Sequence, residues 1–194
     1  MSTRFAVCVL LSSLGVDSVA AAVKFMEEVS MGKVICNRII LVANKTPLSH
    51  PELEYYAGLL AKRLGVEYKV LKPVCYAYSP PTCRFCWKTN PLARFLRSLP
   101  SYPSRYILLV TGQRRSESSV RAKLGEWGSM YGVVVYRPVY NYFKTACWNV
   151  SSRVMPELVP VWKEIARKNG GHTSLDCTQC LRILKKKNGL RSNK

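Results

Sequence analysis

The chain has 194 residues, of which 48% are hydrophobic and 10% aromatic, so it can bury a core and is neither disordered nor collagen-like. Thirty Lys and Arg residues stand against eleven Asp and Glu, giving a formal net charge of +19, which indicates a polyanionic partner such as nucleic acid or nucleotide phosphates. No apolar run reaches the roughly 18 residues of a membrane span, and we expect a cytoplasmic protein without a membrane partner.

Strand and helix patterns alternate along the chain. Apolar runs rich in Val, Ile and Leu predict strands at 5–11, 38–43, 106–111 and 132–136, and a further strand is predicted at 67–71. Helical patterns cover 19–29, 51–64, 92–99, 144–153 and 157–168, and residues 73–91 read as an irregular loop. The alternation predicts an α/β fold: a Rossmann-like, mostly parallel five-stranded sheet with helices on both faces. We expect one domain over 1–181, followed by a basic tail over 182–194 that is either solvated or contacts nucleic acid.

A turn of small residues follows the first predicted strand. Gly15 lets the backbone approach an anion, and the hydroxyls of Ser12, Ser13 and Ser18 face the start of the next helix, where free N–H groups and the helix dipole favour negative charge. We therefore expect a phosphate-binding turn. The alternative is a plain strand-to-helix turn, capped by Asp17 or Ser18.

Three arginines lie within eight residues after the fourth predicted strand. Arg114, Arg115 and Arg121 can each bind two phosphate or sulfate oxygens, and Gly112 frees the turn before them. Because ligands bind at the carboxyl ends of parallel strands, we expect loops 12–18, 43–50 and 112–121 to meet at one edge. A solvated basic loop is the alternative.

Eight cysteines are many for this length, and four of them form two C-x-x-C pairs about ninety residues apart. Four thiolates suit an iron–sulfur cluster or tetrahedral zinc, and the spacing alone leaves both open. A purely structural or disulfide role is the alternative to a metal site. The predicted ligands are Cys83, Cys86, Cys177 and Cys180. We expect Cys8 to be a small buried apolar residue, whereas Cys36, Cys75 and Cys147 have no partner pattern.

These motifs occur in the order found in the phosphoadenylyl-sulfate (PAPS) reductase family of the PP-loop superfamily. The turn Ser12–Ser18 resembles the family's PP-loop, and the stretch Gly112–Arg121 resembles its Gly-x-Arg-Arg-x-x-Ser-x-x-Arg anion-binding segment. The chain is also similar to the family at Pro51-Glu52, at Cys86, Lys88 and Pro91-Leu92, and at the late pair Cys177 and Cys180. It departs from the family at 44–47, where an Asp-Thr-Gly with its acid is expected, and at its last residues, which carry no reductase cysteine.

The resemblance implies an adenine-nucleotide fold in which 12–18 holds the phosphates and Arg114, Arg115 and Arg121 hold a second anion. It also implies a four-iron four-sulfur cluster, with zinc as the alternative, and Mg²⁺ accompanying ATP. Candidate catalytic residues are Asp17, Arg114 and Arg115. Phosphate ligands would come from a wider set, namely Ser12, Ser13, Gly15, Asp17, Ser18, Gly112, Arg114, Arg115 and Arg121.

Two functions of different classes follow. The first is an enzyme that uses ATP or adenylyl sulfate for sulfur chemistry, by ATP-dependent sulfur transfer or by divergent sulfonucleotide reduction. Its partners would include tRNA or DNA and a sulfur or electron donor protein, and the short chain leaves room for a homodimer. The second is a non-catalytic nucleic-acid-binding or regulatory module that keeps the fold and a structural zinc.

Overall fold

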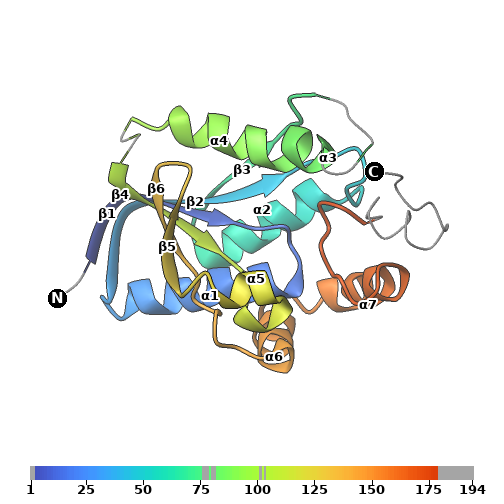
Figure 1. The fold of residues 1–194 in the computed structure, drawn as a ribbon. Coiled ribbons are helices and arrows are strands. Elements are labelled where there is room, and N and C mark those ends of the chain that lie inside the picture. Colours follow the sequence, from blue (N-terminus) through green and yellow to red (C-terminus); the bar gives the residue numbers. More distant parts are fainter. Residues whose placement is uncertain (1–2, 76–78, 80–81, 101, 103, 179–194) are drawn as a thin grey trace.

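A six-stranded sheet with the strand order β3-β2-β1-β4-β6-β5 is the centre of the computed structural model (Figure 1). The structure describes residues 3–75, 79, 82–100, 102 and 104–178. The strands are β1 (Thr3–Leu11), β2 (Val34–Asn44), β3 (Glu67–Leu71), β4 (Ser104–Thr111), β5 (Trp127–Met130) and β6 (Val133–Tyr136). All neighbouring pairs are parallel except β5 with β6, so the predicted mostly parallel α/β sheet is confirmed.

Helices cover both faces of this sheet. They are α1 (Val16–Ser30), α2 (Leu53–Leu64), α3 (Thr82–Arg84), α4 (Asn90–Arg97), α5 (Ser119–Ala122), α6 (Lys144–Val154) and α7 (Leu158–Lys168). A π-helix, η1 (Phe85–Thr89), joins α3 to α4, and a 3-10 turn, η2 (Arg115–Glu117), precedes α5. In Figure 1, α4 lies above the sheet while α1, α2 and α6 lie below it.

The central strands are buried on both faces, which explains their unbroken apolar runs. Val7 and Val9 of β1 belong to the core cluster that contains α4, whereas Cys8 and Leu10 belong to the cluster that contains α1, α2, α6 and α7. Alternation along a strand sends successive side chains to opposite faces, so a strand with helices on both sides needs apolar residues at every position.

Three details differ from the sequence prediction. The sheet has a sixth strand, β5, whose exposed residues pair antiparallel with β6 and form no apolar run. The segment expected to be an irregular loop contains α3 and η1. Helix α1 begins at Val16, earlier than expected, so Asp17 and Ser18 lie in its first turn and Gly15 takes the N-cap position.

Two disulfides correct the expectations for the cysteines. Cys8 is fully buried, as expected, but its sulfur is bonded to that of Cys36 on the neighbouring strand β2. Cys75, which had no partner pattern, is bonded to Cys86. None of the helices within the described ranges has the length and apolar character of a membrane span.

Candidate functional site

The turn between β1 and α1 is held in an unusual backbone conformation. Leu14 has a φ of 54°, a left-handed value that is uncommon for a residue with a side chain. Its side chain is fully buried, and Trp162 Nε1 of α7 donates a hydrogen bond to its carbonyl oxygen at 2.7 Å. Within the turn, the hydroxyl of Ser12 accepts from Leu14 N at 3.1 Å. Core packing and these bonds fix the turn before any ligand arrives.

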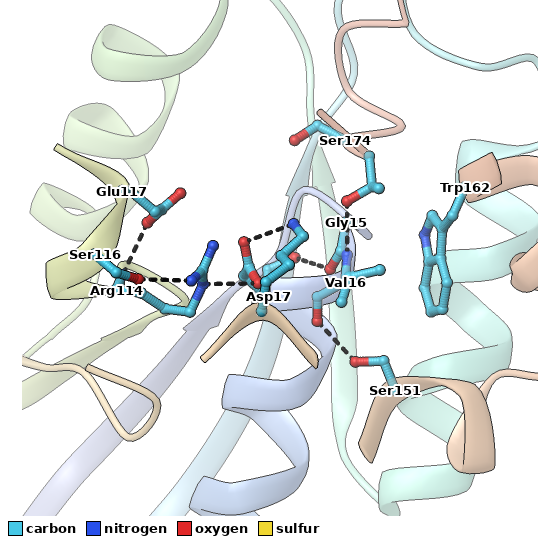
Figure 2. Close-up of polar contacts among 12 residues, drawn as sticks. Gly15, Val16, Asp17, Arg114, Ser116, Glu117, Ser151, Trp162 and Ser174 are labelled. Carbon is cyan, nitrogen blue, oxygen red and sulfur yellow. Dashed lines mark hydrogen bonds and ion pairs between the residues drawn. The ribbon is translucent and has the colours of Figure 1, made fainter. Parts of the chain in front are cut away.

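A segment far away in the sequence braces the same turn. Thr173 Oγ1 accepts from Val16 N at 3.1 Å, and Leu175 N donates to the Ser13 carbonyl at 2.9 Å. The hydroxyls of Ser13 and Ser174 lie 3.1 Å apart. Gly15 fits beneath this segment because an added Cβ would lie 3.2 Å from Thr173 Oγ1 (Figure 2). No motif predicts this contact, because it joins residues that lie far apart in the chain.

The start of α1 borders a cleft. Gly15 at the N-cap has no side chain and supplies no side-chain capping hydrogen bond to the first turn, in which Val16 N donates to Thr173 Oγ1. The positive end of the dipole of this 15-residue helix therefore lies at a cleft that Ser13, Gly15 and Ser18 help to line. Ser12 is 1% exposed and supports the turn from inside, with its hydroxyl 3.2 Å from that of Ser18.

Asp17 connects three elements at the cleft. Arg114 Nε lies 3.0 Å from its Oδ1, and Lys144 Nζ at the start of α6 donates to its Oδ2 at 3.1 Å (Figure 2). The first turn of α1 thus carries a carboxylate that positions two cations.

Burial, together with the nearby Asp17 carboxylate, raises the pKa of the Cys147 thiol to about 12.

The loop 112–121, which we call the arginine loop, places its three arginines in different surroundings. Arg114 is 7% exposed and lines the cleft, and its Nη1 donates a hydrogen bond to Ser116 Oγ at 2.8 Å. Arg121 also lines the cleft and is paired with Glu117. Arg115 is exposed, lies outside the cleft lining and donates to Asn141 Oδ1 at 3.4 Å.

Gly112 permits the close approach of β4 to α1. An added Cβ would lie 2.5 Å from the Asp17 carbonyl oxygen and 2.6 Å from Ser18 Cα, distances that real Cβ contacts essentially never reach. Since these are backbone atoms, no side-chain movement relieves the overlap. Glycine at this position therefore places the loop 112–121 directly beside the turn at 12–18.

The cleft that results has a volume of about 540 Å³. Residues from 12–18, 43–50 and 112–121 all line it, so the three predicted loops meet at one edge. Five cationic and three acidic side chains line it among the described residues: Arg84, Lys88, Arg114, Arg121 and Lys144 against Asp17, Glu117 and Asp176. The excess of positive charge favours an anionic ligand.

Two buried polar atoms in this lining have no partner within the described part of the chain. They are Asn44 Oδ1 at the end of β2 and Thr111 Oγ1 at the end of β4. Their residues are 4% and 5% exposed. An unpaired buried polar atom costs free energy, and one at a ligand cleft is satisfied when the ligand supplies the partner.

Asp176 places an acid beside the 44–47 segment, whose own acid is missing. The backbone carbonyl of Asp176 accepts from Thr46 Oγ1 at 2.5 Å, and its 5% exposed side chain pairs with Lys88 of η1 at 2.9 Å. Asp176, Lys144 and Lys88 also line the cleft, and the sequence analysis did not predict them there. Asp176 could have been suspected from the adjacent Cys177 motif and Lys88 from the segment Lys88-x-x-Pro, whereas no motif includes Lys144.

Three of the four predicted metal ligands, Cys83, Cys86 and Cys177, lie in the described part of the chain, and they form no metal site there. Among the described residues, no three Cys, His, Asp or Glu side chains come together as metal ligands. Cys86 is bonded to Cys75, so in this state its sulfur does not fit a cluster or a zinc ion. Cys83 is half-buried on α3, and Cys177 follows Asp176 at the cleft. Cys180 and the tail over 182–194 lie outside the described residues.

Comparison with solved structures identifies the fold. No protein-family model and no curated protein sequence matches the chain. A PAPS reductase from Candida auris in complex with phosphate aligns with 77% of the chain and 71% of its own length, at 12% identity and a TM-score of 0.49. The U34-tRNA thiolase NcsA from Methanococcus maripaludis, with its [4Fe-4S] cluster, aligns with 80% of the chain at 13% identity and a TM-score of 0.53.

The chain therefore shares the fold of this thiolase, which agrees with the resemblance at the level of the fold. Identities this low show the fold alone, and the aligned part spans 57% of the thiolase.

Proposed function

We propose that the cleft binds the phosphates of an adenine nucleotide, ATP or adenylyl sulfate, and that the protein is an enzyme of sulfur chemistry. The observation that carries this proposal is the first turn of α1. Its start, which carries the positive end of the helix dipole and has no side-chain cap from Gly15, borders a cleft lined by Arg114, Lys144 and Arg121. A helix N-terminus combined with guanidinium groups is a favourable site for phosphate.

Asp17 would act as a positioning residue. Its carboxylate lies 3.0 Å from Arg114 Nε and 3.1 Å from Lys144 Nζ, which directs both cations at the cleft. A phosphate that enters would share these cations, and they would stabilise the charge that develops at phosphorus or on the leaving group. Mg²⁺ would enter with ATP as part of the substrate.

ATP-dependent sulfur transfer to a nucleic-acid acceptor is the form of the reaction that we favour. An acceptor carbonyl oxygen attacks the α-phosphorus, and the bond to pyrophosphate breaks. A sulfur nucleophile then attacks the activated carbon, and AMP leaves with that oxygen. The net charge of +19 supports a nucleic-acid acceptor, and a solved structure of similar fold is a tRNA thiolase. Reduction of adenylyl sulfate is the other form of sulfur chemistry.

The four-cysteine site stays a prediction, and no step above depends on it. The Lys88–Asp176 ion pair supports it by holding the residue before Cys177 against η1, the helix that carries Cys86. The Cys75–Cys86 bond opposes it unless a reductant opens that bond. Anaerobic purification under reductant, followed by assays of iron, sulfide and zinc, tests it. Four irons and four sulfides would support the cluster, and one zinc without colour would support a structural metal.

Turnover tests the reaction itself. The protein is incubated with ATP, RNA and sulfide, and AMP and pyrophosphate are measured; a parallel reaction contains adenylyl sulfate, reductant and an assay for sulfite. Sulfur transfer predicts RNA-dependent AMP release that is lost in Arg114→Gln and kept in Arg4→Gln, which removes an exposed arginine on β1, away from the cleft lining. Sulfite and AMP formed together from adenylyl sulfate, with no RNA-dependent release of AMP from ATP, would favour reduction. A folded protein that turns over neither nucleotide would contradict the enzyme and favour the binding module.

A further inference from the structure

A long part of the chain carries positive charge with no acid to balance it. Between Glu67 and Glu117 there is no Asp or Glu, whereas Lys and Arg occur nine times. Chance mixing of charges on a solvated surface gives both signs, so an acid-free stretch of this length indicates a surface that meets polyanions.

Several of these positive residues are exposed to solvent on the segment formed by α3, η1 and α4. In the continuous segment α3–η1–α4, the inward side chains are buried: Cys86 and Trp87 of η1, and Leu92, Phe95 and Leu96 of α4. Arg84, Phe85, Arg94 and Arg97 are exposed on the opposite side. Because the apolar side is packed on the sheet beneath α4, as Figure 1 shows, the charged side has to face solvent.

The edge strand β3 extends the same face. Lys69 Nζ lies 5.2 Å from the centre of the Phe95 ring, which holds this lysine against α4. Lys72 follows directly after β3 and is exposed. We call the surface formed by Lys69, Lys72, Arg84, Phe85, Arg94 and Arg97 the α4 face.

The α4 face is continuous with the cleft. Arg84 belongs to both, and Lys88, Thr89 and Leu92 of the same segment line the cleft. A chain that lies along α4 and passes Arg84 would therefore reach the phosphate turn. In the described part of the chain, none of Arg84, Arg94 and Arg97 forms an ion pair with a carboxylate, in contrast to Arg114 and Arg121.

The chemistry of this face fits one class of partner. Guanidinium groups bind phosphate oxygens two at a time, and an aromatic ring stacks on an unpaired base. Phe85 is 55% exposed between Arg84 and the cleft-lining Lys88. We propose that the α4 face binds a single-stranded nucleic acid and leads it into the cleft. This proposal rests on the proposed function in one respect only, namely that the bound strand is the acceptor of the transferred sulfur.

Fluorescence anisotropy tests the proposal with a labelled 20-nucleotide RNA strand, a DNA strand of the same sequence and the corresponding duplex, each over a range of salt. The wild type is compared with the double variant Arg94→Gln/Arg97→Gln. The control is Arg4→Gln/Lys33→Gln, which removes two exposed charges at the amino ends of β1 and β2. We expect the salt slope of strand binding to fall by about 1.4 in the α4 variant, because each lost phosphate contact removes about 0.7.

A second pair of variants tests base stacking. Phe85→Ala is expected to weaken strand binding by about 5- to 150-fold and to leave duplex binding unchanged. Tyr55→Ala, which removes an aromatic ring that is 63% exposed on α2, should change neither. Equal losses in the two charge variants, or a Phe85→Ala variant that binds strands as the wild type does, would overturn the proposal. Wild-type ATP affinity is measured separately: strand binding as predicted without ATP binding would contradict the proposed function and leave this inference intact.

Discussion

Replacing Gly112 with alanine should destabilise the fold at the junction of β4 and α1. The new Cβ would lie 2.5 Å from the Asp17 carbonyl oxygen, whereas ordinary contacts begin near 3.4 Å, so backbone has to move by roughly 0.9 Å. Forced overpacking of this kind costs about 1–3 kcal/mol. For a chain of this size that lowers the melting temperature by about 2–12 °C. The displaced first turn of α1 should also bind ATP more weakly.

Thermal unfolding followed by circular dichroism measures this, with Gly58→Ala as the matched control. An added Cβ on Gly58 of α2 would lie 3.3 Å from the ring of Tyr68, a side chain that is 52% exposed and free to shift. Alanine also favours a helix interior over glycine by about 0.5–1 kcal/mol. Gly58→Ala should therefore melt at or above the wild-type temperature. A Gly112→Ala variant with wild-type melting and ATP affinity would refute the close approach of strand and helix.

Three further predictions concern the walls of the cleft. Thr111→Val should keep or raise the melting temperature, because it removes a buried hydroxyl that has no partner among the described residues. It should also weaken ATP binding, measured by calorimetry, because that hydroxyl would bind the ligand. Unchanged ATP affinity would show that the Thr111 hydroxyl does not contact the ligand. Trp162→Phe should lose about 1–3 kcal/mol in denaturant unfolding, since the buried Leu14 carbonyl loses its 2.7 Å donor; an unchanged midpoint would show that the turn needs no such brace. Burial raises the pKa of the Cys147 thiol from 9.0 to about 12, so the folded state holds this proton more tightly, and the stability it contributes below pH 9 is lost as the pH rises toward 12. The melting temperature of the wild type should fall more steeply over that range than that of Cys147→Ala, and parallel pH profiles would contradict this.

The fold could be predicted because its signals are local. Strands buried on both faces require continuous apolar runs, and β1, β2, β4 and β6 have them. Gly65 ends α2 at a φ of 66°, the left-handed conformation that its residue type favours. Strand β5 gave no such signal, because its exposed residues are held by backbone pairing with β6, which any sequence can make.

The site could be predicted only where one segment supplies the chemistry. The turn at 12–18 and the arginine loop could be found because each is continuous in sequence and follows a strand. The segment with Thr173 and Asp176 could not, since it joins the turn through hydrogen bonds between residues far apart in the chain. Adjacent Arg114 and Arg115 look alike in sequence, yet the backbone turns one into the cleft and the other to solvent.

The most direct test of the central claim is a calorimetric titration of the protein with ATP and Mg²⁺. The account predicts saturable binding of one ATP per chain to the wild type. It predicts a roughly 10- to 150-fold weaker affinity in Arg114→Gln, where a charged phosphate contact is lost, and a much smaller change in Arg115→Gln. A folded wild-type protein that shows no saturable ATP binding, or equal losses in the two arginine variants, would contradict the assignment of this cleft to nucleotide phosphates.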